Sequence, residues 1–204
     1  MMYKIYNMEQ RTQEWYDIRK GKITASNFGT AVGHSSFKSP KELSDELKQN
    51  KKFSNEAIEH GIKMEPIARN FYSELYKVEV KEIGFAVPVW YPKIGCSPDG
   101  IIYVDSKETN KIIEIKCPKQ MYDQLSVRNY LISEGVKFDL FNHSHINTTH
   151  YDQIQGNLAI LNKEYCDYIV FVNKDDYYIE TIPFNKIYWE LLFEKIKIFC
   201  NEFL

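Results

Sequence analysis

The chain has 204 residues, of which 15% are aromatic and 26% charged, and its formal net charge is −2. This length supports one domain with a substantial core and leaves little room for a second. The composition is typical of a folded globular protein, with no case for long disorder, and the small net charge excludes a molecule that attracts polyanions as a whole. We therefore predict one domain over residues 1–204, on which any nucleic-acid site is local.

The cysteines and the apolar C-terminal stretch indicate the environment of the protein. The four cysteines are scattered, without a Cys-x-x-Cys pair or a secretory leader, which favours a reduced, intracellular protein. Lysines and glutamates interrupt the apolar residues 186–204, as in an amphipathic or core helix rather than a membrane span. We expect no membrane partner.

Helical patterns dominate the first third of the chain. A helix is expected over residues 12–20, with Thr12 as its N-cap, and a second over 24–32, capped by Thr24 or Ser26. Helical periodicity returns over 40–49 and again over 54–76, where Pro66 is expected to kink the helix. The last helix carries an apolar stripe formed by Ile58, Ile62, Ile67, Phe71 and Leu75.

Strand patterns follow, rich in β-branched and aromatic residues. The predicted strands cover residues 83–90, 99–104, 111–116, 167–172 and 176–182. The predicted helices of this part cover residues 119–133, 148–161 and 185–203. Helices, a strand meander, a helical crossover and further strands indicate the α/β class, with a mixed β-sheet flanked by α-helices.

Two carboxylates and a lysine converge in the strand meander. In a strand, residues two apart share a face, so Glu114 and Lys116 point the same way while the isoleucines beside them point to the other side. A hairpin loop over residues 105–110 would bring Asp99, near the start of one strand, next to Glu114, near the end of the other. Carboxylates this close repel each other unless a cation neutralises them.

Such a cluster indicates a metal site. Carboxylate oxygens suit Mg²⁺ or Mn²⁺ rather than Zn²⁺, which prefers His and Cys. A neighbouring lysine suits the stabilisation of hydroxide and of phosphate charge. These are the parts of metal-assisted phosphodiester hydrolysis.

Four sequence motifs carry a family resemblance. "SPDG" followed by "EIKCP" resembles the PD-(D/E)xK nuclease motif, in the form of the lambda exonuclease and YqaJ-type viral recombinase family. "EWYDIRKGKITAS", "GIKMEPIARNFY" and "YDQIQ" are similar to three further motifs of that family, in the same order along the chain. The resemblance reaches from about residue 11 to about residue 160. It implies a single nuclease domain with a restriction-endonuclease-like fold.

The resemblance also implies a role for particular residues. The implied metal ligands are Glu65, Asp99, Glu114 and the carbonyl of Ile115. Lys116 is the implied catalytic lysine, and Gln153 lies close to the active site. Arg19 and Ser26 would hold a terminal 5′ phosphate, which selects chain ends over internal bonds.

The activity implied by the resemblance is Mg²⁺-dependent 5′ to 3′ exonuclease action on duplex DNA, with Mn²⁺ as a substitute ion. It leaves single strands for recombination or repair. The family frequently forms ring-shaped trimers that work with a single-strand annealing protein. The compartment follows the host, either the cytoplasm of a bacterium or a compartment of a cell infected by a eukaryotic virus.

Other interpretations of these residues stay open. Ser26 lies in the first turn of a predicted helix, where backbone N–H groups and the helix dipole favour an anion, but it equally suits a helix cap. Arg19 suits a structural salt bridge, and Gln153 an ordinary polar helix position. If Arg19 and Ser26 are structural, the chain would be a structure-specific or restriction-like endonuclease with the same catalytic core. A catalytically idle DNA-binding accessory protein is a separate alternative.

Basic and histidine-rich segments add weaker candidates. The "KQNKK" loop and the region of Lys119, Arg128 and Lys137 are candidate contacts to the DNA backbone, and solvated surface is the alternative. The "HSH" sequence at residues 143–145, with His150 nearby, lacks the partner spacing of a zinc site. We interpret it as a loop with incidental histidines.

Overall fold

The computed structural model describes residues 2–49, 55–119, 126–127 and 148–204. Its strands are β1 (Tyr3–Tyr6), β2 (Ile23–Thr24), β3 (Glu79–Lys81), β4 (Phe85–Pro88), β5 (Ile94–Gly95), β6 (Gly100–Val104), β7 (Lys107–Lys116), β8 (Tyr165–Asn173) and β9 (Asp176–Pro183). Its helices are α1 (Gln13–Arg19), the 3₁₀ turn η1 (Ala25–Asn27), α2 (Phe28–Ala31), α3 (Pro40–Gln49), α4 (Glu56–Tyr76), α6 (Thr148–Leu161) and α7 (Lys186–Phe203).

A mixed sheet in the order β3-β6-β7-β8-β9 forms the centre of the molecule. Only β7 and β8 pair in parallel, and the connection between them includes α6; the other neighbours are antiparallel. Two small ladders, β1-β4 and β2-β5, lie outside this sheet. The predicted mixed α/β fold is confirmed.

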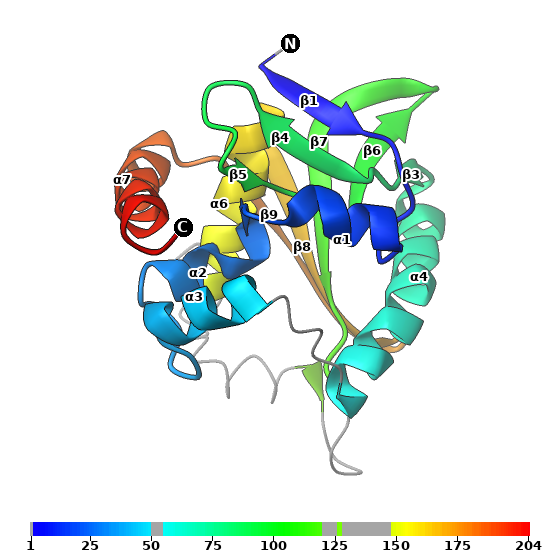
Figure 1. Ribbon diagram of the computed structural model, residues 1–204. Helices are drawn as coiled ribbons and strands as arrows, with labels where there is room; N and C mark the ends of the chain where they lie inside the picture. Colours follow the sequence, from blue (N-terminus) through cyan, green and yellow to red (C-terminus); the bar gives the residue numbers. More distant parts are fainter. Residues whose placement is uncertain (1, 50–54, 120–125, 128–147) are drawn as a thin grey trace.

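Helices cover both faces of the sheet (Figure 1), with α4 on one side and α6 with α7 on the other. Ile113 and Ile115 of β7 pack with Ala68 and Tyr72 of α4, as the alternation of the strand predicts. The opposite face of β7, which carries Glu114, is turned toward α6.

A glycine allows α6 to lie close to the N-terminal segment. A Cβ on Gly156 would lie 2.4 Å from the ring of Phe28, which is a severe overlap. The close approach holds α6, with Gln153 and Asn157, over the end of β7. Among the described residues, no helix is both long and apolar enough to cross a membrane.

The segment around Ser26 differs from its prediction. Instead of one helix over residues 24–32, it forms the end of β2, then η1, then the four-residue α2. Ile23 and Thr24 pair with β5, and this parallel ladder draws the backbone away from a helix. The argument for an anion site at a helix N-terminus is therefore wrong, because η1 has only three residues.

The hairpin between β6 and β7 is tighter than predicted. The turn consists of Asp105 and Ser106, with φ of 50° and 62°, and β7 begins directly after it at Lys107. Two residues with positive φ are typical of a type I′ turn, which matches the twist of paired strands. Residues 107–110, predicted as loop, therefore belong to the ladder.

The apolar stripe of α4 does not face the sheet. Four of its five members are 41–49% exposed, namely Ile58, Ile62, Ile67 and Leu75. The buried side of the helix presents Glu65, Ala68 and Tyr72 instead. The small Ala68 lets the helix approach the sheet, and α4 runs through Pro66 without interruption.

Some predictions lie outside the described residues. They are most of the helix predicted over 119–133, Arg128, Lys137, the histidines of 143–145 and the end of the "KQNKK" loop. Within the described part, all four cysteines are free thiols. His150 is bonded through Nδ1 to the Tyr168 hydroxyl at 2.9 Å, and burial lowers its pKa to about 3.

Candidate active site

The turn that carries Asp99 is held by the N-terminal segment. The Trp15 indole N–H lies 3.1 Å from the Gly84 carbonyl and 3.0 Å from Ser97 Oγ. The Ser97 hydroxyl donates to the same Gly84 carbonyl. Because Trp15 is buried, this hydrogen-bond network restricts the position of the turn that leads into β6.

Asp99 lies beside Glu114, as the hairpin predicted. Gly100 pairs with Ile113, which makes Asp99 and Glu114 the next neighbours across the ladder. Asp99 Oδ2 accepts a 2.6 Å hydrogen bond from the backbone N–H of Ile115. Burial raises the pKa of Asp99 well above its ordinary value, and the carboxylates of Glu114 and Glu65 raise it further.

Glu114 is buried and held by side chains from β7 and α6. Lys116 Nζ lies 2.8 Å from Glu114 Oε1, and the Gln153 amide donates to the same oxygen at 2.6 Å. Lys116 also donates to Gln153 Oε1 at 3.0 Å. Asn157 donates to Glu114 Oε2 at 3.1 Å, while its own Oδ1 is buried with no hydrogen-bond partner in the described part of the chain.

Glu65 reaches the same site from α4, between two arginines. Arg69 Nη2 lies 2.6 Å from Glu65 Oε1, and Arg11 pairs with Oε2. Arg69 also donates to the Asp99 carbonyl at 2.8 Å, so it ties the glutamate to the Asp99 turn. The three predicted carboxylates thus come together from α4, the turn before β6 and β7.

The oxygen ligands of the site fit a Mg²⁺ ion that keeps several of its waters, rather than an ion coordinated entirely by protein groups. No three His, Cys, Asp or Glu side chains of the described residues form a ready-made metal cluster. Mg²⁺ commonly keeps several waters and takes only one or two protein carboxylates. Asp99 and Glu114 meet that requirement. The pKa of Asp99 is raised first by burial and then by the neighbouring carboxylates, and a bound cation would counter both effects by favouring the charged carboxylate.

Arg19 is positioned for an anion. Its guanidinium carbon lies 3.6 Å from the centre of the Trp15 ring, and Nη2 donates to Thr24 Oγ1 at 3.3 Å. Within the described residues no carboxylate pairs with Arg19, and burial lowers its pKa to about 10, so it stays charged at neutral pH. Ser26 bonds to the same Thr24 hydroxyl at 3.0 Å.

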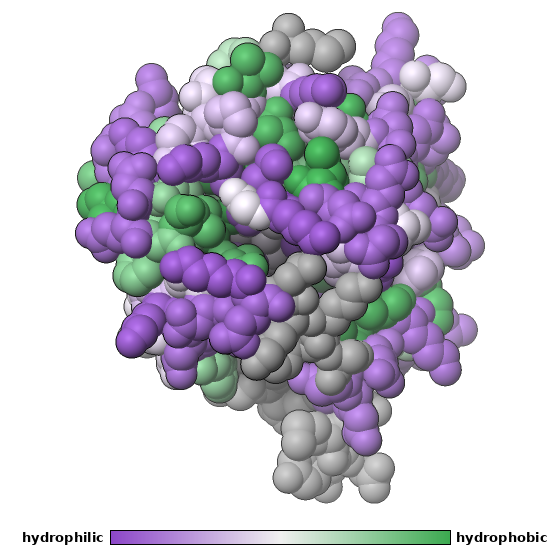
Figure 2. Space-filling view, in the orientation of Figure 1, coloured by the Kyte–Doolittle hydropathy of each residue, from purple (hydrophilic) through white to green (hydrophobic). Residues whose placement is uncertain are grey.

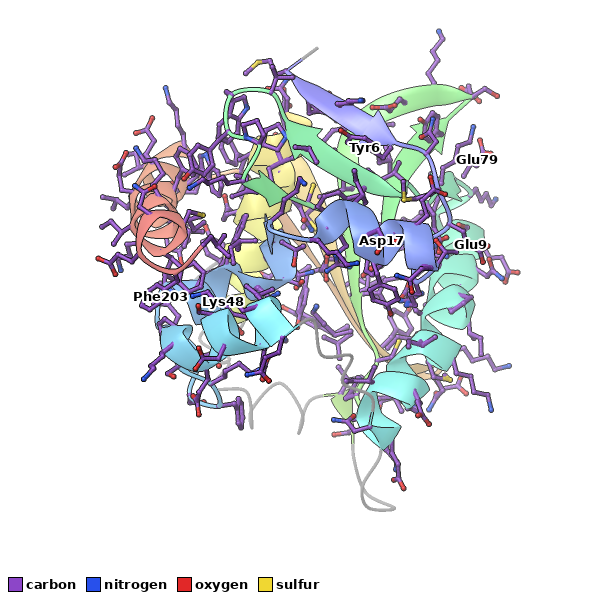
Figure 3. All side chains as sticks on the ribbon, viewed as in Figure 1. Tyr6, Glu9, Asp17, Lys48, Glu79 and Phe203 are labelled. Atoms are coloured by element: carbon purple, nitrogen blue, oxygen red, sulfur yellow. The ribbon has the colours of Figure 1, made fainter. Side chains whose placement is uncertain are left out.

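These groups share one cavity of about 760 Å³. Its lining includes Arg11, Arg19, Ser26, Glu65, Asp99 and Lys116. Hydrophilic side chains cover much of the face in Figure 2, with hydrophobic groups between them. Figure 3 labels Asp17 on the exposed side of α1, the helix whose inner side supplies Trp15 and whose end supplies Arg19.

Comparison with known proteins decides the family. Residues 14–164 match the YqaJ-like viral recombinase domain, which is most of the chain. The chain belongs to the YqaJ-like viral recombinase family. The match includes every residue to which the resemblance assigned a role.

This YqaJ-like domain also resembles a viral protein. It is 32% identical over 123 residues to an uncharacterized protein of Acanthamoeba polyphaga mimivirus. The aligned part covers 56% of this chain and 22% of the viral protein, so the chain spans under a quarter of that relative's length.

Solved exonucleases share the fold of the YqaJ-like domain. The alkaline exonuclease LHK-Exo from Laribacter hongkongensis superposes with a TM-score of 0.72 at 24% identity, over 94% of this chain and 92% of the other. Its complex with dAMP superposes at 0.74, with the same identity and coverage. A SOX–DNA complex superposes at 0.55 with 12% identity, over 90% of this chain and 65% of that one. These superpositions show the shared fold, and the family indicates a nuclease, a class that generally uses divalent metal ions.

Several residues of the site were missed by sequence reasoning. Asn157 and Arg69 each lie four positions after a predicted site residue, Gln153 and Glu65, so helical spacing offered a signal for both. Arg11 offered none, because its contact with Glu65 spans 54 residues.

Proposed function

We propose that this chain is a Mg²⁺-dependent 5′ to 3′ exonuclease on double-stranded DNA that leaves single strands for recombination or repair. The observation that carries the proposal is the placement of Arg19, a charged guanidinium without a carboxylate partner in the described residues, in the cavity that holds Asp99, Glu114 and Lys116. A phosphate bound there would fix a strand end beside the carboxylates. Selection of ends over internal bonds follows from such a pocket.

In this proposal the carboxylates bind the metal ion and Lys116 stabilises the negative charge that develops on the phosphate. Asp99, Glu114 and the Ile115 carbonyl would hold the metal ion, with Glu65 close by, and Mn²⁺ would substitute for Mg²⁺. When bound, the ion supplies a lowered pKa for water and stabilises charge on the phosphate. Lys116, held by Glu114 and Gln153, presents a positive group to the developing negative charge.

Arg19 and Ser26 would bind the terminal 5′ phosphate. The Trp15 ring holds the guanidinium in place, which lowers the entropy lost when it binds the anion. Ser26 contributes its hydroxyl, oriented through Thr24. Duplex DNA would otherwise be held through its backbone, with little sequence preference.

The resemblance to the family extends the proposal to partners. A homotrimer would enclose the duplex, and a single-strand annealing protein would take up the exposed strand. The compartment would be that of the host cell.

Digestion of matched substrates tests the activity. A linear 5′-phosphorylated duplex and the same DNA as a closed circle are incubated with Mg²⁺ or with a chelator, beside Lys116→Ala. We expect degradation of the linear form alone, from its 5′ ends, and only with metal and Lys116. Cleavage of the circle would favour the endonuclease, and duplex binding without any cleavage would favour the idle accessory protein.

A further inference from the structure

Arg11 occupies a backbone position that suits glycine. Its φ is +68°, in the left-handed region where a side chain carries a conformational cost. The residues on either side are held in place: the Gln10 amide donates to the carbonyls of Ile83 at 2.9 Å and Pro98 at 3.3 Å, and Thr12 caps α1. A cationic side chain is therefore held at the wall of the cavity despite the backbone cost.

The two arginines on Glu65 differ in how firmly they are held. Arg69 is 12% exposed and also contacts the Asp99 carbonyl and the Glu82 carboxylate. Arg11 is 34% exposed, and within the described residues Glu65 is its one charged partner. Of the two, Arg11 is the more easily displaced.

We infer that Arg11 competes with the divalent cation for Glu65 and, once displaced, binds a phosphate of the DNA in the same cavity. This inference rests on the proposed function, because it needs both a metal and DNA at the site. A guanidinium and a divalent cation repel each other at one carboxylate oxygen. The guanidinium fork matches a phosphate as well as a carboxylate.

The exchange links the two ligands. The cation frees Arg11 for the DNA, and a DNA phosphate that holds Arg11 frees Glu65 for the cation. By linkage each ligand then strengthens the binding of the other by the same factor. Glu65 would become a full metal ligand mainly when DNA is bound.

Metal titration in the absence of DNA tests the competition. Mn²⁺ binding to the full chain is measured by calorimetry for wild type, Arg11→Gly and Arg11→Gln. Both variants should bind Mn²⁺ more tightly, by about two- to five-fold, the size expected when a partly exposed ion pair is lost. Glycine removes the conformational cost of the positive φ, whereas glutamine keeps it. If both variants gain affinity for Mn²⁺, the loss of the Arg11 charge is therefore the cause.

The chain offers a matched control in Lys77. It is cationic, exposed and held at φ +54° as the C-cap of α4, with no contact to Glu65. Lys77→Gly removes the same charge and the same backbone cost at the C-terminal end of α4, twelve residues after Glu65. Its affinity for Mn²⁺ should equal that of wild type.

Duplex binding tests the second half of the exchange. In a Lys116→Ala background with Mn²⁺ present, Arg11→Gly should weaken binding to a 5′-phosphorylated duplex. It should also reduce the slope of log affinity against log salt by about one, the loss of one phosphate contact. The same measurement without metal should show a smaller difference.

The outcomes separate this inference from the proposed function. If wild type binds Mn²⁺ and cuts DNA but neither Arg11 variant binds the ion more tightly, Arg11 is a fixed structural partner and the inference is wrong. If Arg11→Gly leaves the slope of log affinity against log salt unchanged, Arg11 makes no contact with a DNA phosphate and the second half of the inference is wrong. If wild type binds no Mn²⁺ and cuts no DNA, the proposed function fails first and the inference with it.

Discussion

Asp99 accepts a 2.6 Å hydrogen bond from the backbone N–H of Ile115, which joins the turn before β6 to the end of β7 through a carboxylate. The carboxylate that is implied as a metal ligand therefore also fixes the geometry of the two motif strands. Its environment opposes its charge, since burial and two neighbouring carboxylates raise its pKa.

Asp99→Asn should stabilise the protein when divalent cations are chelated. The pKa of Asp99 is raised in the folded state, so its contribution to stability is present below the ordinary pKa of an aspartate and is lost as pH rises through the folded pKa. Asparagine keeps the acceptor for the Ile115 N–H and removes the charge. We expect a gain of about 1 kcal/mol at pH 7.5, or about 2–4 °C in melting temperature.

Thermal denaturation in chelator from pH 5 to pH 8 measures this effect. The wild-type melting temperature should fall with pH more steeply than that of the variant. Added Mg²⁺ should raise only the wild-type value, because a ligand stabilises the state that binds it. A variant less stable than wild type at pH 7.5 in chelator would contradict the view that burial and the neighbouring carboxylates disfavour a charged Asp99.

Asn157→Ala should weaken the metal site without disrupting the fold. The amide of Asn157 orients Glu114 through Oε2, and loss of a residue that orients a ligand typically costs about 10- to 100-fold in metal affinity or activity. Calorimetric titration with Mn²⁺ and the rate of duplex digestion measure the change.

Gln155→Ala is the control for that prediction. Gln155 lies on the same helix and is buried, but it bonds to the Pro183 carbonyl and the Asn185 N–H. Its loss should lower stability by about 1–3 kcal/mol, the cost of buried groups left unpaired, with unchanged metal affinity. Equal effects of both variants on metal affinity would argue against a specific role for Asn157.

Arg19→Ala should remove the preference for phosphorylated ends. The variant loses a charge-assisted contact of about 1.5–3 kcal/mol, so digestion of a 5′-phosphorylated duplex should slow by about ten-fold or more. Digestion of the same duplex with a 5′ hydroxyl should change little. The ratio of the two rates, measured for wild type, Arg19→Ala and Arg19→Lys, decides the matter, and a uniform loss on both substrates would indicate a structural role.

Trp15→Phe should lower stability and metal affinity together. The indole N–H serves both Gly84 and Ser97, and loss of this shared hydrogen bond should cost about 0.5–1.5 kcal/mol, because the Ser97 hydroxyl still donates to the Gly84 carbonyl. The turn that carries Asp99 then loses its support. Melting temperature and Mn²⁺ affinity are the measurements, and Trp90→Phe, at a 40% exposed position, should leave both nearly unchanged.

Local sequence patterns were sufficient to predict the class of fold and the centre of the site. Strand alternation separated Glu114 from its isoleucine neighbours, and the hairpin brought Asp99 beside it; both are local rules that depend on period and turn residues. The motif order along the chain identified the family. The structure agrees with the strand alternation and the hairpin because the geometry of each is set by residues close together in the sequence.

The surroundings of those residues depend on contacts between segments that are distant in the sequence. The short β2 forms because it pairs with β5, and this pairing cannot be predicted from the local propensity of its residues. The strand stands where part of the helix around Ser26 was predicted. Likewise Glu65 lies between Arg11 and Arg69, and Asn157 donates to Glu114, across separations of up to 54 residues. Hydrogen bonds and charge pairs between distant segments depend on how whole helices and strands pack against each other. The spacing of residues within one segment does not predict that packing.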